Sequence, residues 1–506
     1  MGIHALVLAR DESHNLSDCI HSLRLAVDEI TVFDTGSRDR SSEVAHELGA
    51  RWVPIAWHDD FALARNEALE RIGADWILVI DADERLDPDA GQRIRAAAAR
   101  AAPHDVAFHL EQRTYTDDLE ALGYTGLPVA ESMRRGASGY VPRPEPRLLR
   151  SGCGLHYVGS VGERLHRGSG APLPLTGPTI GVLHHGRELE PLGRRAARRL
   201  LHLRLALRAV VESGEPESFA RLGALLNQEG HWRAALAYLR AATAKSEEAA
   251  VHLQAGVARL HLGLVEGAVA SFRRAHRELP DHPEVATCLA RALIRTNHPV
   301  ALVEAGELLE TALDQAPQLD QAVLQRAVWQ RRCGEFEAAR ACLQTLVERN
   351  PVHTSALKEL GAVALLQGQA LESEQHLRQA LRMRPDDPEI LNNLGCALER
   401  RGMWREALET FDRAVQLAAG DERYLRNRCV ANAACGRLAA MCRDAHRALL
   451  ASEDPVGLLL RLREDCLDAD WVAALRRLEN WAVENHWLSD EGRILPVAAT
   501  ASRLCG

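Results

Sequence analysis

The sequence predicts an N-terminal α/β domain with a mostly parallel sheet, followed by an all-α solenoid of helical repeats. Two observations support the α/β domain. Strand patterns alternate with helical patterns three times, and a strand pattern buried on both faces, Trp76–Ile80, then runs into the acids Asp81 and Asp83. A third observation supports the solenoid, because glycines recur every 34 residues in the C-terminal half.

Each predicted strand near the N-terminus is a short apolar run that stops at polar residues. The four runs are Ile3–Ala9, Glu29–Phe33, Trp52–Ile55 and Trp76–Ile80. Between them, apolar residues recur at helical spacing behind the capping candidates Asn15, Asp39 and Asp60. This alternation predicts a parallel sheet with helices on both faces.

Acidic residues follow three of these strands. Glu12 comes after the first strand, Asp34 after the second, and Asp81 with Asp83 after the fourth. In an open parallel sheet, ligands bind beyond the carboxyl ends of the strands, so we expect these acids at the rim of a cleft. Two carboxylates on one side of an extended chain suit Mg²⁺ or Mn²⁺ carrying a diphosphate. The alternative is an acidic loop that is merely solvated.

Beyond residue 100 the pattern is less regular. Val106–Leu110 and Arg147–Arg150 read as strands, and Ile180–Gly186 as a closing strand. Residues 112–146 are rich in Gly, Pro, Arg and Asp without a period, which is typical of a functional loop. We interpret this segment as acceptor-side structure or a lid.

Residues 1–190 resemble the family 2 glycosyltransferases, whose nucleotide-sugar domain has the fold called GT-A. Four motifs in order carry the resemblance: Leu8–Glu12 with Asn15-Leu16, Phe33–Ser37 with Asp39, Asp59–Phe61 with Ala64–Asn66, and Ile80–Glu84. The resemblance implies a nucleotide-diphosphate sugar as donor substrate and a divalent metal, Mn²⁺ or Mg²⁺, that neutralises the departing diphosphate.

The resemblance also implies roles for residues of the donor site. Asp34 is expected on the base or ribose, Glu12 on the ribose, and Arg65 near the nucleotide. Asp83 is expected to bind the metal, with Asp81 on the ribose or on the metal. For Arg65, a plain helix-surface arginine is the alternative.

Two later residues complete the implied site. Glu163 matches the Glu of a Gly-x-Val-His-Glu pattern and is our candidate general base, which an inverting transfer needs in order to remove the acceptor proton. Gly162 stands where the family often has His, and a salt-bridging role for Glu163 is the alternative. His184, after the closing strand, is the candidate third metal ligand, with a structural histidine as the alternative.

The rest of the chain is predicted to be helical. Residues 191–214 form a basic connector whose arginines face solvent or, as the lesser reading, contact a phosphate or an acidic peptide. Residues 215–457 hold about seven units of the tetratricopeptide type, marked by glycines 34 residues apart, and residues 458–506 form the capping helices and tail. One inner position of successive units is polar and could hold a peptide backbone, or could be inert: Gln325, Glu359, Asn393 and Asn427.

The composition of the chain argues against several classes of protein function. A net charge of −9 gives no support to nucleic-acid binding, and no apolar run is long enough to span a membrane. The eleven cysteines include no Cys-x-x-Cys, and the N-terminus lacks the pattern of a signal peptide, so we expect a reduced, cytoplasmic compartment.

Together these patterns predict an inverting, metal-dependent glycosyltransferase. The order of domains resembles that of peptide glycosyltransferases of the sublancin S-glycosyltransferase type, which implies a Ser, Thr or Cys side chain of a peptide or protein, docked partly on the repeats, as acceptor. Elongation of a carbohydrate or lipid-linked glycan is the first alternative, and a non-catalytic repeat scaffold is the second. The sequence leaves open the sugar, the base, the metal and any homo-oligomer.

Overall fold

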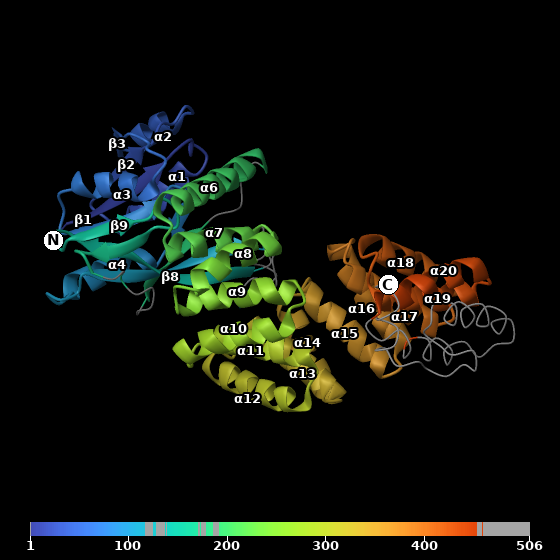
Figure 1. The fold of residues 1–506 in the computed structure, drawn as a ribbon. Helices are drawn as coiled ribbons and strands as arrows, with labels where there is room; N and C mark the ends of the chain where they lie inside the picture. Colours follow the sequence, from blue (N-terminus) through green and yellow to red (C-terminus); the bar gives the residue numbers. More distant parts are fainter. Residues whose placement is uncertain are drawn as a thin grey trace. The chain divides into compact units, whose positions relative to one another are not determined.

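A computed structural model describes residues 2–116, 125–127, 137, 139–170, 173, 179–185, 192–452 and 458. The chain divides into two compact units, residues 1–329 and 330–506, which are described separately. The first unit holds a sheet domain and the first helical repeats, and the second holds the remaining repeats (Figure 1). Among the described residues, no helix is both long and apolar enough to cross a membrane.

The sheet of the first unit has the spatial order β3-β2-β1-β4-β8-β6-β11-β5, with β7 beside β8. Its strands, within the described residues, are β1 (Ile3–Ala9), β2 (Glu29–Asp34), β3 (Arg51–Pro54), β4 (Trp76–Asp81), β5 (Glu84–Leu86), β6 (Ala107–Thr116), β7 (Thr125–Gly126), β8 (Gly139–Arg150) and β11 (Thr179–His185). A separate hairpin is formed by β9 (Leu155–Val158) and β10 (Arg164–Arg167). The first four strands are mutually parallel, as predicted, whereas β8 runs antiparallel to both β4 and β6.

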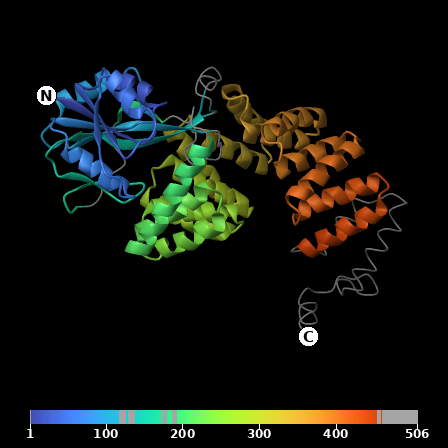
Figure 2. The same cartoon turned by 90° about the horizontal axis from the view of Figure 1, so that it is seen from above.

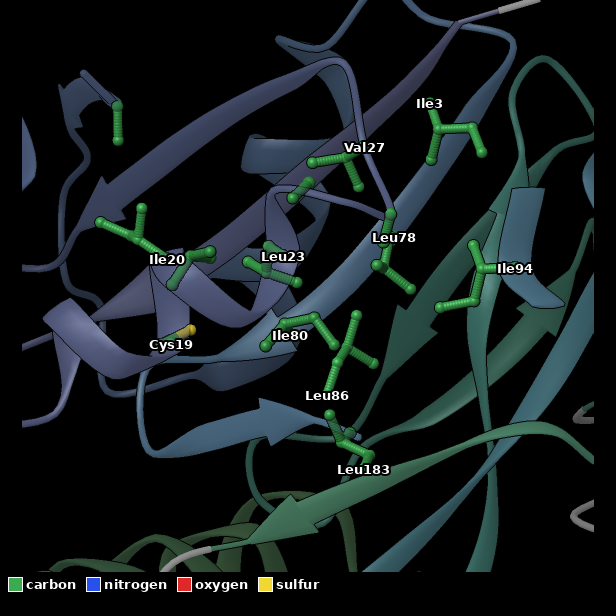
Figure 3. Close-up of a cluster of buried hydrophobic side chains, with 14 of the residues drawn as sticks. Ile3, Cys19, Ile20, Leu23, Val27, Leu78, Ile80, Leu86, Ile94 and Leu183 are labelled. Carbon is green, nitrogen blue, oxygen red and sulfur yellow. The ribbon is translucent and has the colours of Figure 1, made fainter. Parts of the chain in front are cut away.

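Helices cover both faces of the sheet, also as predicted. The helices of this domain are α1 (Leu16–Leu23), α2 (Ser41–Glu47), α3 (Phe61–Glu70) and α4 (Ala90–Arg100). Alternate residues of β1 enter two different cores, because successive side chains of a strand point to opposite faces. Ala5 and Val7 join the core that contains α1, α2 and α4, part of which is shown in Figure 3, while Leu6 and Leu8 join the core that contains α3.

This topology places the acids predicted for the donor site at one edge. In the parallel register, Ala9 at the end of β1 pairs with Asp34 on one side, and Leu8 pairs with Asp81 on the other. Asp34 and Asp81 therefore flank the carboxyl end of β1, with two strand spacings, about 10 Å, between their strands. Residues 82 and 83 form a turn, so the alternation expected of an extended chain does not carry over to Asp83.

The prediction that residues 112–146 are irregular is wrong at both ends of this segment. Residues 112–116 belong to β6 and residues 139–146 to β8, and the two strands pair continuously from Ala107↔Leu149 to Thr116↔Gly139 around one bulge. The prolines at 142, 144 and 146 hid this strand, because proline is rare in paired strands. Most of residues 117–136 lie outside the described residues.

Helices follow one another from residue 192 onward. In the first unit, α6 to α12 stack side by side, as Figure 2 shows in green to yellow. The helices, as far as the structure describes them, are α6 (Leu192–Ser213), α7 (Pro216–Gln228), α8 (Trp232–Thr243), α9 (Ala249–His261), α10 (Val265–Glu278), α11 (Pro283–Thr296), α12 (Pro299–Gln315), α13 (Asp320–Arg332), α14 (Phe336–Arg349), α15 (Thr354–Leu366), α16 (Ala370–Met383), α17 (Pro388–Arg400), α18 (Trp404–Leu417), α19 (Glu422–Ala434) and α20 (Leu438–Ala451).

The 34-residue glycine period has a backbone cause. Gly334, Gly368, Gly402 and Gly436 each follow the first helix of a pair, and each has a φ between 71° and 83°. A residue with a Cβ rarely adopts this conformation, so glycine lets the chain turn sharply into the second helix.

Candidate active site

The loops after β1 and β2 are tied together by short polar side chains. Asp34, at the end of β2, is buried and accepts hydrogen bonds from the Ser37 backbone N–H (2.9 Å) and hydroxyl (2.6 Å). Asp39 accepts from Ser13 and Ser41. Burial acts to raise the pKa of Asp39, but these hydrogen bonds outweigh it and hold the pKa at about 2. The Asp-Thr-Gly-Ser motif therefore builds a rigid turn beside the end of β1.

A buried arginine lies at the centre of the site. Arg65, on α3, donates from Nη2 to Asp81 (2.7 Å) and from Nε to Glu163 (2.5 Å), although the two acids are 82 residues apart in sequence. Burial opposes the charge, but Asp81 and Glu163 hold the pKa of Arg65 well above its ordinary value. The Arg65 side chain is 9% exposed, and its buried Nη1 has no hydrogen-bond partner.

A second buried ion pair lies beneath Asp81. Glu84 is fully buried and accepts from Arg147 Nη2 (2.7 Å), from Gln112 (2.5 Å) and from the backbone N–H of Asp81 (2.8 Å). Arg147 Nη1 also lies 3.8 Å from Asp81 Oδ2. Glu84 therefore fixes the turn that presents Asp81.

The segment that carries Glu163 is clamped from two helices. Asn66, next to Arg65 on α3, exchanges two hydrogen bonds with the backbone of Tyr157 (2.7 and 2.9 Å). Further along, Arg221 of α7 donates to the carbonyl of Val161 (2.7 Å). The ring of Tyr157 faces the Arg65 guanidinium at 5.5 Å, and burial raises the pKa of Tyr157 to about 12. The Ala-Arg-Asn motif of α3 thus both holds and orients the Glu163 segment.

Helix α6 supplies a further cation. Arg198 Nη1 lies 3.1 Å from Asp83 Oδ2, and Asp83 is largely buried. His202, one turn further along α6, packs its ring edge-on against Phe61 at 5.7 Å. Burial and Arg198 lower the pKa of His202, whereas Glu163 and Asp83 oppose this change, so His202 lies within electrostatic range of both acids.

The third predicted metal ligand has other partners. His184 lies in β11, where its Nδ1 is 2.6 Å from the Tyr115 hydroxyl and its Nε2 is 3.4 Å from Asp87. Within the described ranges, no three His, Cys, Asp or Glu side chains are grouped to hold a metal. Asp81 and Asp83 offer the oxygen donors that Mg²⁺ and Mn²⁺ prefer, so their chemistry suits a cation, but in this structure Asp81 pairs with Arg65 and Asp83 with Arg198. His184 does not join them in this arrangement.

The structure therefore brings Arg65, Asp81 and Glu163 into contact and places Asp34 along the same edge. Glu12 stays on the loop after β1, where it accepts from Asn15 (2.8 Å). Sequence reasoning missed the roles of five residues: Glu84, Arg147, Tyr157, Arg198 and His202. Two of them carried a signal: Glu84 ends the Ile80–Glu84 motif, and Arg198 belongs to the basic connector for which a phosphate contact was the lesser alternative. Arg147 and His202 lie far from the motifs in sequence, whereas Tyr157 lies close to the Glu163 motif but had no residue type that pointed to its role.

Of the polar positions predicted on the repeats, three are satisfied within the protein or buried. Glu359 accepts from Arg331 (2.9 Å), Asn427 donates to Asn392 (2.8 Å), and Gln325 is buried. Their role in holding a peptide remains a prediction.

Comparison of the sequence with known protein families agrees with this architecture. Residues 5–138 match Glycosyl transferase family 2, and residues 221–283 and 352–420 match tetratricopeptide repeats. The chain thus carries a glycosyltransferase domain of family 2, with an α/β fold consistent with GT-A, followed by a tetratricopeptide solenoid.

Individual relatives cover only part of the chain. A TPR repeat-containing protein of Synechococcus elongatus is 30% identical over 242 residues, which are 46% of this chain and 54% of that protein. The lipopolysaccharide core biosynthesis glycosyltransferase LpsC of Rhizobium meliloti is 28% identical over 192 residues, 37% of this chain and 64% of LpsC. This chain therefore spans less than two thirds of either relative. A solved tetratricopeptide repeat protein from Parabacteroides merdae aligns with 46% of this chain and 93% of its own, at 13% identity and a TM-score of 0.41.

Proposed function

We propose that this protein transfers a sugar, with inversion, from a nucleoside-diphosphate sugar to a Ser, Thr or Cys side chain of a peptide or protein. The single observation that carries the proposal is the Arg65 bridge, which joins an acid of the donor edge, Asp81, to the candidate base, Glu163. The match of residues 5–138 to family 2 glycosyltransferases supports the same reading.

The donor is proposed to lie along the carboxyl ends of β1, β2 and β4. Asp34 and Glu12 would hold the base and ribose, since carboxylates accept hydrogen bonds from ribose hydroxyls and from base N–H groups. The buried Nη1 of Arg65 has no partner, which suits a donor oxygen. Asp81 and Asp83 would hold a divalent cation, which when bound neutralises the diphosphate.

Glu163 is proposed as the general base. As the acceptor oxygen or sulfur forms its bond to the anomeric carbon, Glu163 takes the proton of that hydroxyl or thiol. The bond from the anomeric carbon to the diphosphate oxygen breaks, and its electron pair leaves with the nucleoside diphosphate. One displacement of this kind inverts the anomeric centre. Arg65 fixes the Glu163 carboxylate, so that the base is in place before the acceptor arrives.

The acceptor is the part of the proposal for which a second candidate exists. Tetratricopeptide repeats suggest interaction with a protein and favour a peptide acceptor. The similarity to LpsC favours a growing glycan instead, because its name places that relative in lipopolysaccharide core synthesis.

The test is turnover of the full chain with UDP-, GDP-, dTDP- and ADP-sugars, with Mn²⁺ or with EDTA. Acceptors are peptides that contain Ser, Thr and Cys, or oligosaccharides, and mass spectrometry detects the added sugar. We expect Glu163→Gln to reduce turnover at least a hundredfold, within the range of lost general-base catalysis. Glu43→Gln, on an exposed face of α2, is the matched control and should keep full activity.

The outcomes separate the candidates. Sugar on peptides alone supports the proposal, and sugar on oligosaccharides alone supports the glycan reading. A chain that binds no nucleoside diphosphate and adds sugar to neither class would be a repeat scaffold without donor chemistry.

A further inference from the structure

The arginines of the connector helix α6 have different partners. Arg199 contacts Glu229, directly after α7 (3.3 Å), and Arg204 contacts Asp59 in the loop before α3 (2.9 Å). Arg198 instead reaches Asp83, in the turn after β4. Among the α6 arginines whose side chains the structure describes, Arg198 is the one that pairs with an acid of the Ile80–Glu84 motif.

The position of Arg198 is set by packing. Leu205 and Ala206, on the following turns of α6, are almost completely buried in one cluster with Val161, which lies two residues before Glu163. His202 rests against Phe61 at the start of α3. These contacts hold α6 against the segments that carry Arg65 and Glu163. The packing of α6 therefore places Arg198 beside Asp83.

The chemistry of Arg198 itself suits an anionic ligand at this place. In the reaction proposed above, negative charge develops on the diphosphate next to Asp81 and Asp83. A guanidinium has five N–H donors in a planar fork that matches phosphate oxygens, and it stays charged at any physiological pH. The Arg198 side chain is 36% exposed, whereas Asp83 is 13% exposed, so the arginine is the partner that a ligand can reach from solvent.

We propose that Arg198 is a binding residue for the donor diphosphate, which α6 carries into the site and Asp83 holds ready in the ligand-free protein. This inference rests on the proposed function. The connector helix is then a part of the donor site. When the donor binds, the Arg198 guanidinium either leaves the Asp83 carboxylate for the phosphate oxygens or donates hydrogen bonds to both.

The experiment measures binding, not turnover. Isothermal titration of the full chain with UDP, GDP, dTDP and ADP identifies the nucleoside diphosphate that binds, and the matching nucleoside is titrated beside it. For Arg198→Gln we expect diphosphate affinity to fall roughly tenfold or more, with nucleoside affinity unchanged, since a charge-assisted hydrogen bond is lost. Arg199→Gln, one residue along and paired with Glu229, is the control and should bind like the wild type.

A double variant separates direct contact from charge neutralisation. The double variant is titrated in EDTA, so that the cation proposed for Asp83 is absent from every protein compared. If Arg198 only neutralises Asp83, then Asp83→Asn combined with Arg198→Gln restores the affinity that the wild type shows in EDTA, and the inference is wrong. If Arg198 touches the diphosphate, the double variant stays weak. Thermal melts confirm that each variant folds.

Failure of the inference and failure of the proposed function look different. Equal diphosphate affinity in Arg198→Gln and the wild type overturns the inference and leaves the glycosyltransferase proposal intact. A wild-type chain that binds none of the four diphosphates, with or without Mn²⁺, overturns both.

Discussion

The buried carboxylate of Glu84 gives a direct test of how the site is built. Glu84→Gln keeps the size of the side chain but removes its charge and replaces one acceptor oxygen with an NH₂ donor. In the structure, Arg147, Gln112 and the Asp81 N–H all donate to Glu84, and its side chain is fully buried. In the variant, the new NH₂ group therefore faces one of these donors, so that two donors oppose each other without an acceptor. Arg147 also loses its closest carboxylate.

The magnitude follows from burial. Removing one partner of a buried ion pair costs about 3–5 kcal/mol, because the remaining charge has no compensation. For a domain of this size, each kcal/mol lowers the melting temperature by roughly 2–4 °C, so we expect a loss of about 10 °C. Donor affinity should fall as well, because Glu84 fixes the backbone of Asp81.

Differential scanning calorimetry of the full chain measures this effect. Glu111→Gln is the matched control, since Glu111 pairs with Arg113 at 2.6 Å on the same sheet but both side chains are partly exposed. An exposed pair contributes less than about 1 kcal/mol, so this variant should melt within about 3 °C of the wild type. If Glu84→Gln melts as high as Glu111→Gln, burial does not set the strength of this pair and the reasoning fails.

Two further predictions concern the repeats. A Cβ on Gly395 would lie 2.5 Å from the ring of Phe411, so Gly395→Ala should destabilise the second unit by about 1–3 kcal/mol in urea unfolding. Gly420→Ala is the control and should be neutral, because a Cβ there would have nothing within 4 Å. Equal losses of stability in the two variants would contradict the packing argument. His353 caps α15 by accepting the Ala356 N–H at 3.2 Å, and burial lowers its pKa from 6.5 to about 4. Because the unfolded chain takes up the proton first, the second unit should lose about 3 kcal/mol as the pH falls from 6.5 to 4 and nothing above that range. His353→Asn, which caps without titrating, should remove this part of the pH dependence, and an unchanged profile would refute the assignment.

The α/β fold and the helical repeats could largely be predicted from local sequence patterns. Strand runs, the Asp60 cap and the 34-residue glycine period each depend on neighbours in sequence, and Asp60 does accept the Leu63 N–H (2.9 Å) at the start of α3. The strand β8 was not readable along most of its length, because its prolines argue against a strand and only pairing with β6 reveals it.

The sequence by itself determined which acids stand at the strand ends, since the parallel register carries Asp34 and Asp81 to one edge whatever the rest of the chain does. Only the tertiary structure decided which cations pair with Asp81 and with the neighbouring Asp83. Arg65, Arg147 and Arg198 come from a helix, a distant strand and the connector, and no local periodicity relates such separate segments. An ion pair depends on distance in space, whereas a sequence pattern records distance along the chain.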